Sequence, residues 1–359
     1  YLEFKHNGKP FLMKNITYLI EQVSTKDRNS NKPTENQSDS NKVRTTGKFG
    51  TGFMTTHLLS KVVQLNSIFE DPKCKIYKRF NLNLDRSAAT IEEMIEAVKK
   101  ASDIRRHLDD ENICPTLASD YQLYQTCDTS FRYQLNKEGF KVAQKGIEDL
   151  HNAIIYTLVF IPELESVIVK DETKSIETSY CIQNRKKLEE ITISHIEKRV
   201  GDQIEKVIIA NCSKIINLAD EEGEISIAIQ LEDISNQYSV VKLNSFAPLL
   251  FCDFPLIGSE SKFQYPLVIN SPLLEPTEPR DSILLDDRNE TGGKKNRAIF
   301  EETISLYGIL LDYAAQNWLN PHFLALAGLP KNIDSEWYES HIQSSIRAKV
   351  LESKLVCTN

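Results

Sequence analysis

The stretch Thr45-Thr46-Gly47-Lys48-Phe49-Gly50-Thr51-Gly52-Phe53 carries three glycines at G-x-x-G-x-G spacing. Apolar residues then recur at helical spacing, and the predicted helix face consists of Met54, Leu58, Leu59, Val62 and Val63. Glycine has no Cβ, so other groups can approach its backbone closely, and the first N–H groups of a helix have no partner within it. These N–H groups and the helix dipole favour negative charge, which predicts a cradle for phosphate groups.

The glycine spacing alone also fits an ordinary turn. It is not a Walker loop, because no Gly-Lys-Ser/Thr sequence closes it, and the dinucleotide fingerprint would follow a strand directly. Here residues 24–46, which are nearly free of apolar side chains, precede it. Such a segment buries too little surface to offset the entropy cost of ordering. It is either a loop without a role or a lid that moves over a binding site, and its position before the glycines favours the lid.

The chain begins with a pattern typical of a strand followed by a turn. Leu2 and Phe4 alternate with charged residues, which predicts a strand with one buried face. Asn7-Gly8 then predicts the turn at the end of this strand. The order of elements is therefore strand and turn, polar segment, Gly-rich loop and helix.

This order resembles the ATP-binding domain shared by gyrase, the ninety-kilodalton heat-shock chaperone, histidine kinases and mismatch-repair ATPases, the GHKL family. Residues 47–53 look most like the chaperone's Gly-x-Phe-Gly-x-Gly-Phe, and His6-Asn7-Gly8-Lys9-Pro10-Phe11 resembles the sacsin-like branch. The resemblance implies a Bergerat-type two-layer α/β sandwich over residues 1–160. It implies ATP and Mg²⁺ as ligands, with a lid at about residues 24–46.

The resemblance also assigns residues to the nucleotide site. The Gly-rich backbone would hold the phosphates, Lys48 would add positive charge, and Gly8 would let the chain pass close to the adenine. Thr129, which opens an alternating strand, matches a threonine near the adenine, although strand preference alone also explains it. The expected nucleotide-binding residues are His6, Asn7, Gly8, Gly47, Lys48, Phe49, Gly50, Thr51, Gly52, Phe53 and Thr129.

His6 departs from the family pattern. The first box of the family normally opens with an aspartate that accepts a hydrogen bond from the adenine amino group. A neutral imidazole can accept on one nitrogen and donate on the other, so His6 is compatible with adenine recognition but with a different geometry and pH dependence. The alternative is an ordinary half-buried histidine.

A second informative stretch covers residues 265–281. A strand ends at Asn270, and a loop with three prolines then presents Arg280. Prolines reduce the entropy lost when such a loop is held in place. The stretch resembles the loop of the chaperone's middle domain that sends an arginine toward the γ-phosphate, so Arg280 is the expected catalytic residue. The alternative is a surface ion pair of Arg280 with Glu278 or Asp281.

The pattern changes close to Pro162, beyond which β-branched strands alternate with charged turns. We therefore predict an α+β chain with a second, mixed-sheet domain, similar to a middle or transducer domain, over residues 161–330. A C-terminal helix is expected within residues 331–359. In the first domain, helices are expected over residues 12–23 and 140–154, and Thr90-Ile91-Glu92-Glu93 predicts a capping box at the start of another.

Composition restricts the classes of partner. The net charge of -8 argues against a dominant nucleic-acid surface, and no run of apolar residues reaches the length of a membrane span. Seven cysteines occur without a CxxC pair or a zinc-like spacing. This use of cysteine is typical of buried, reduced thiols, so we expect a cytoplasmic protein with no metal site of its own.

In the related ATPases, a helix before the first strand carries a Glu that activates water and an Asn that holds magnesium. We expect that helix upstream of Tyr1. Two functions remain open. The first is a chaperone-like ATPase that closes its lid, delivers Arg280 and forms a homodimer or a larger complex that acts on a protein client or effector. The alternative is a nucleotide-gated interaction module with little or no hydrolysis, for example in a defence or signalling complex.

Overall fold

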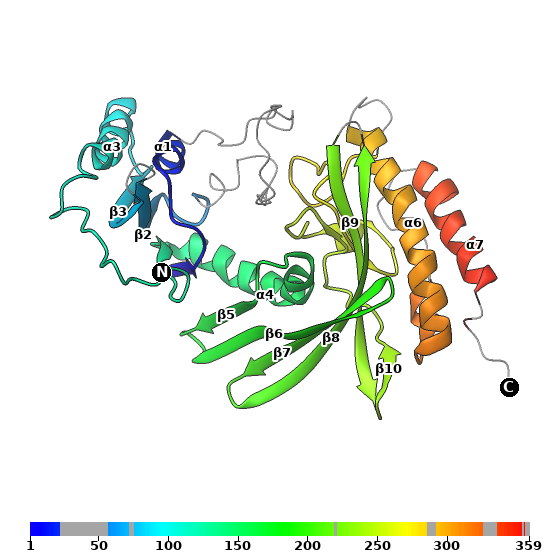
Figure 1. Cartoon of the computed structure of the whole chain (residues 1–359). Helices are drawn as coiled ribbons and strands as arrows, with labels where there is room; N and C mark the ends of the chain where they lie inside the picture. The colour runs from blue at the N-terminus through cyan, green and yellow to red at the C-terminus, as the bar shows by residue number, and fades with distance from the viewer. Residues whose placement is uncertain are drawn as a thin grey trace. The chain divides into compact units, whose positions relative to one another are not determined.

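The computed structural model describes residues 1–21, 57–71, 75–218, 221–285, 292–325, 336–353 and 355. It divides into two compact units, of which the first holds the described residues up to Gly146 and the second begins at Ile147 (Figure 1). The boundary that we predicted at residue 160 is instead the end of helix α4 (Lys137–Phe160), which belongs in part to each unit. The chain mixes helices with largely antiparallel sheets, in agreement with the α+β class.

The sheet of the first unit has four antiparallel strands in the order β1-β4-β2-β3. They are β1 (Leu2–His6), β2 (Val62–Asp71), β3 (Ile76–Asp85) and β4 (Thr129–Tyr133). One face of the sheet packs against α1 (Met13–Glu21) and α3 (Ile91–Asp103), which a short 3-10 turn at Ile104–Arg106 follows. The buried core of this unit includes Ile16, Ile20, Val63, Leu65, Phe80, Leu82, Leu84 and Ala101.

Strand β2 corrects the helix that we predicted from Met54 onward. Val62 and Val63 lie in this strand, and Leu58, in the turn before it, is 78% exposed. The buried positions 63, 65, 67 and 69 follow the strand period of two. The short apolar run at Val62 and Val63 fits the helical period as well as the strand period. The hydrogen-bonded pairing with β3 and β4 shows that it forms a strand. Residues 54–56 and the glycine-rich stretch 45–53 lie outside the described residues.

The capping box predicted at the start of α3 is confirmed. The backbone N–H of Glu93 donates to Oγ1 of Thr90 at 3.2 Å, and the backbone N–H of Thr90 donates to the Glu93 carboxylate at 3.3 Å. These bonds satisfy N–H groups that a helix start would otherwise leave without partners, and a cap of this kind contributes about 1 kcal/mol. The predicted strands at β1 and β4 and the predicted helices at α1 and α4 are also present.

The second unit contains an eight-stranded sheet in the order β11-β12-β9-β8-β7-β6-β5, with β10 paired to β9. Neighbouring strands are antiparallel except for β11 and β12, which makes the sheet mixed, as predicted. The strands are β5 (Ser166–Asp171), β6 (Ile176–Leu188), β7 (Ile191–Val200), β8 (Gln203–Leu218), β9 (Glu221–Ile234), β10 (Gln237–Val240), β11 (Leu250–Phe251) and β12 (Val268–Asn270).

Helices cover both faces of this sheet, with α4 on one side and α6 (Gly292–Asn317) and α7 (Ser344–Glu352) on the other (Figure 1). Along β8, Ile208 and Ala210 pack toward α6, whereas Val207 and Ile209 pack toward α4. A strand that is buried on both faces reads as a continuous apolar run, which residues 207–210 show. The remaining short helices are α5 (Ser259–Lys262), η2 (Pro321–Leu324) and η3 (Tyr338–Gln343).

The C-terminal helix expected within residues 331–359 is present, as a π-helical turn, η3, that leads into α7. The expectation of buried thiols holds for Cys114, Cys212 and Cys252, whereas Cys127 is exposed. Within the described part of the chain, no helix combines the length and the apolar character that a membrane crossing requires.

Candidate functional site

Polar side chains interrupt the apolar face of the first sheet in one cross-strand row, formed by His6 on β1, Thr129 on β4 and Ser67 on β2. His6 and Thr129 are Cα partners in the antiparallel β1–β4 pair. The hydroxyl oxygens of Thr129 and Ser67 lie 2.6 Å apart. The adjacent pair along β1 and β4 is aromatic, Phe4 opposite Phe131. We call His6, Thr129 and Ser67 the polar row.

The polar row runs from a half-buried end into the core. His6 is half-buried, whereas Thr129 is 2% exposed and Ser67 is fully buried. The hydrogen bond between the two hydroxyl groups satisfies both of them inside the core. His6 is therefore the member of the row that a ligand reaches first. A ligand contacts Thr129, the predicted adenine neighbour, only after the groups that cover it move.

The turn after β1 determines which nitrogen of the His6 ring carries the proton. The backbone N–H of Gly8 donates to Nδ1 of His6 at 3.0 Å. An accepting Nδ1 carries no proton, so the neutral ring holds its proton on Nε2. Burial lowers the pKa of His6 below its ordinary value of 6.5, which favours this neutral form. A Cβ on Gly8 would lie 2.8 Å from Nδ1, so a side chain at this position would displace the His6 ring.

Side-chain hydrogen bonds hold the segments that flank the polar row. Asn7 Nδ2 donates to the backbone oxygen of Tyr124 at 2.7 Å, which ties the turn after β1 to the segment before β4. Asp128, the last residue before β4, accepts hydrogen bonds from the hydroxyl of Tyr121 and, at 3.2 Å, from Arg79. Asn7, a predicted ligand-binding residue, thus has a structural partner for its amide nitrogen.

Aromatic rings surround His6. The ring centroid of Phe4 lies 5.6 Å from that of His6 and 6.4 Å from that of Phe131, and Phe4 is 56% exposed. The ring centroid of Phe131 lies 6.3 Å from that of His6, with the two rings stacked. These rings offer an apolar surface to a flat ring system beside a polar N–H donor.

Arg280 lies in a tight loop of the second unit. Its backbone N–H donates to the oxygen of Thr277 at 2.9 Å, and a bridge between Pro276 and Ile283 closes the loop. The φ angle of Arg280 is 58°, in the left-handed region that residues with a Cβ rarely adopt. Its guanidinium lies 5.7 Å from the ring centroid of Phe254. The predicted proline-stiffened loop is therefore present and compact.

Asp281 is one of the two acidic residues that the sequence offered as surface partners of Arg280. In the structure its carboxylate accepts from Lys262 at 2.7 Å and from the hydroxyl of Thr277 at 3.1 Å. The bond from Lys262 is the main cause that lowers the pKa of Asp281. Asp281 is thus engaged by a lysine and a threonine.

The remaining predicted site residues, Gly47, Lys48, Phe49, Gly50, Thr51, Gly52 and Phe53, lie outside the described residues, as does the predicted lid at residues 24–46. Among the residues that are described, no three His, Cys, Asp or Glu side chains form a group that could hold a metal ion.

The sequence reasoning missed Ser67. The signal was present, because positions 63, 65, 67 and 69 of β2 share the buried face and Ser67 is the only polar one among these four. A lone serine in such a series marks a place where the core face accommodates a hydrogen bond. It also missed a polar cavity between α4 and strands β6 to β9 of the second sheet.

Comparison of the chain with protein-family models, curated proteins and solved structures finds no match.

Proposed function

We propose that the first unit binds a purine nucleotide at the His6 end of the polar row, and that the chain is an ATPase of the GHKL type with a Bergerat fold. The observation that carries this proposal is the pairing of His6 with Thr129. These two positions are far apart in the sequence, and the family resemblance assigns both to one nucleotide site. A four-stranded antiparallel sheet with helices packed on one face is also compatible with a two-layer sandwich.

The residues of the described site fit a nucleobase. The exposed ring of Phe4 supplies a stacking surface, and Nε2–H of His6 supplies a directional hydrogen bond next to it. Gly8 keeps the turn close to His6 without a side chain in the way. The Ser67–Thr129 hydroxyl pair places further polarity behind His6. An apolar ring face with one polar edge is the environment that a base requires.

The groups proposed to bind the phosphates are assigned from the sequence. The backbone N–H groups of residues 47–52 would hold the phosphates, and Mg²⁺, when bound, would neutralise charge on them. Arg280 would bring positive charge to the γ-phosphate during its transfer to water. Its planar guanidinium can donate two parallel hydrogen bonds to phosphate oxygens, which a lysine cannot.

Calorimetric titration of the full-length protein with ATP and Mg²⁺ tests the binding step. Phe4→Ala should weaken binding about tenfold, because stacking of a base on an aromatic ring contributes about 1–3 kcal/mol. The matched control is Phe246→Ala, since Phe246 is a similarly exposed ring of the second unit, at 72%. Absence of ATP binding to the parent protein, or equal affinity of the Phe4→Ala variant and the parent, would end the proposal.

A turnover assay on the same protein separates the two functional classes. Release of phosphate that depends on Mg²⁺ supports the ATPase. Tight binding of ATP without release of phosphate supports a nucleotide-gated interaction module, in which the ligand changes the population of binding-competent conformations.

A further inference from the structure

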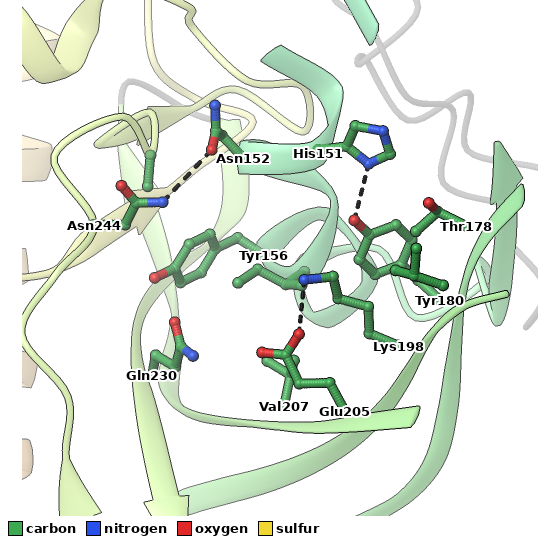
Figure 2. Close-up of a pocket in the computed structure, with 13 residues that line it drawn as sticks. His151, Asn152, Tyr156, Thr178, Tyr180, Lys198, Glu205, Val207, Gln230 and Asn244 are labelled. Atoms are coloured by element: carbon green, nitrogen blue, oxygen red, sulfur yellow. Dashed lines mark hydrogen bonds and ion pairs between the residues drawn. The ribbon is translucent and has the colours of Figure 1, made fainter. Parts of the chain in front are cut away.

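A cavity of about 410 Å³ opens on the face of the second sheet that α4 covers (Figure 2). Its walls come from α4, from strands β6 to β9 and from the loop after β10, all within the second unit. Its volume lies in the range of small-molecule sites, about 300–1,000 Å³. The first unit and its proposed nucleotide site contribute no residue to its lining.

The cavity forms where the sheet face changes from apolar to polar. On β7, Ile196 packs in the core, and Lys198 lies two residues further on the same face. On β8, Val207 packs in the core, and Glu205 lies two residues earlier. Lys198 is the Cα partner of both Glu205 and Tyr180. Tyr180, Lys198 and Glu205 thus lie side by side across three strands, directly beside the apolar contact with α4.

The wall of this cavity contains a buried hydroxyl group, that of Tyr156. The residue is 1% exposed, and its ring packs near Phe251, with the centroids 6.4 Å apart. Among the described residues, the Tyr156 hydroxyl has no hydrogen-bond partner. Figure 2 shows this hydroxyl pointing toward the amide of Gln230. Burial raises the pKa of Tyr156, so the hydroxyl keeps its proton and remains a donor.

A buried hydroxyl without a partner lowers the stability of the folded protein. Natural proteins keep such groups mainly where a bound molecule satisfies them or where function needs them. The position of Tyr156 in the cavity wall makes a bound molecule the direct explanation.

Three side-chain amides supply further hydrogen-bonding groups. They belong to Asn152 on α4, Gln230 on β9 and Asn244 in the loop after β10. Asn244 Nδ2 lies 3.5 Å from Oδ1 of Asn152, at the long limit for a hydrogen bond. Each amide both donates and accepts, as does a phenol hydroxyl. Ligand hydroxyl groups have the same double capacity and therefore match this wall.

The charges in the cavity wall cancel. Lys198 and Glu205 form an ion pair at 2.7 Å. Burial lowers the pKa of His151, and Lys198 and Lys174 lower it further, which favours the neutral form of its ring. Its Nδ1 lies 2.9 Å from the hydroxyl of Tyr180. Because Lys198 is already paired, an anionic ligand would find no free positive charge among the lining residues.

We propose that this cavity binds an uncharged, hydroxyl-rich ring compound, either a sugar or a nucleoside. The amides and the Tyr156 hydroxyl bind its hydroxyl groups, while Ile155, Val200 and Val207 contact the apolar face of the ring. A purely apolar ligand would leave the amides desolvated without partners, which is unfavourable. This proposal is independent of the nucleotide site in the first unit.

Ligand-observed NMR on the full-length protein, with maltose, cellobiose and uridine as probes at millimolar concentration, tests the proposal. Saturation transfer to either disaccharide identifies a sugar site, and transfer to uridine identifies a nucleoside site. In both cases, Tyr156→Phe should abolish most of the signal and weaken affinity about tenfold. Absence of transfer to all three probes overturns the proposal.

The stability of Tyr156→Phe separates a binding role from a structural one. Removing a hydroxyl that has no partner should raise the Tm by a few degrees without ligand. The matched control is Tyr307→Phe, because the Tyr307 hydroxyl donates to the backbone oxygen of Leu324 at 3.0 Å. Both residues lie in the core on the opposite face of the second sheet, beneath α6. This control should lower the Tm and leave probe binding unchanged. Loss of stability in Tyr156→Phe, or unchanged probe binding, contradicts the proposal.

Glu205→Gln tests the charge argument. The substitution keeps the shape of the side chain but leaves Lys198 without its anionic partner. The variant should bind glucuronate, an anionic sugar, about tenfold more tightly than the parent protein does. If the parent protein prefers glucuronate to the neutral probes, the cavity is an anion site and the proposal is wrong.

Discussion

The backbone N–H of Gly8 donates to Nδ1 of His6 at 3.0 Å, and this bond determines what the imidazole can offer to a ligand. With Nδ1 occupied as an acceptor, the neutral ring presents only the Nε2–H donor. The aspartate that the related ATPases carry at this place presents an acceptor instead. The two residues would therefore recognise opposite groups on a base.

The first prediction concerns base preference. Adenine carries an amino donor at position 6, whereas hypoxanthine carries a carbonyl acceptor there. If His6 faces this position, the parent protein binds ITP about tenfold more tightly than ATP, because two donors cannot pair. His6→Asp should reverse the preference. The control is His6→Asn, whose oxygen can accept from Gly8 while its NH₂ group keeps the donor. Competition between ITP and ATP measures the base preference of the parent protein and of both variants. A parent protein that prefers ATP would show that His6 does not contact position 6.

The second prediction concerns pH. Burial lowers the folded pKa of His6 below the unfolded value of 6.5, so the unfolded state binds more protons just below pH 6.5. The free energy of unfolding should therefore fall as the pH drops below 6.5, with no contribution from His6 above it. Burial also lowers the pKa values of His57 and His151, which adds to the same trend. NMR titration of His6 gives its pKa directly, and a value above 6.5 would contradict the buried, neutral ring. In denaturant unfolding, His6→Asn should reduce the pH dependence.

The third prediction compares two glycines of one helix. A Cβ on Gly139 would lie 2.4 Å from the backbone oxygen of Leu59, whereas a Cβ on Gly146 would meet no atom within 4 Å. Gly146→Ala should therefore stabilise the chain by about 0.5–1 kcal/mol through helix propensity. Gly139→Ala gains the same propensity but forces the backbone apart, with a net loss of about 1–3 kcal/mol. Urea denaturation of the two variants checks the difference, and equal stability would mean that α4 does not pack this closely on Leu59.

The fourth prediction concerns Arg280. If its guanidinium stabilises the γ-phosphate during transfer, Arg280→Ala should keep nucleotide affinity and lose about a thousandfold in turnover. Arg280→Gly is the control for the backbone, because glycine adopts the φ of 58° without strain. This variant should be more stable than Arg280→Ala and equally inactive. If the kcat of either variant equals that of the parent protein, Arg280 has a structural role only.

The periodic elements of the chain could be predicted from the sequence. The alternation in β1 and β4 identified strands, and Thr90 with Glu93 identified the start of α3. The β-rich character of the second half followed from its β-branched runs and charged turns. These signals are local, so a single sequence carries them.

Features that depend on tertiary pairing could not be predicted in the same way. Val62 and Val63 fit a helical spacing, and only their partners on β3 and β4 place them in a strand. Pairing of His6 with Thr129 needs the strand order β1-β4-β2-β3, which no local pattern specifies. The cavity around Tyr156 needs the register of four strands under one helix.

Helix α4 runs without interruption from Lys137 to Phe160, although the two compact units divide between Gly146 and Ile147. Dissection of the protein into separately expressed pieces at residue 160, which the sequence suggests, would remove from the second piece the helix residues that fill one of its cores, such as Ala153 and Tyr156. A second piece that starts at Lys137 would keep the whole of α4 and therefore the cores on both faces of the second sheet. The start site chosen for recombinant expression should therefore decide whether this half is obtained as a folded protein or as an aggregate.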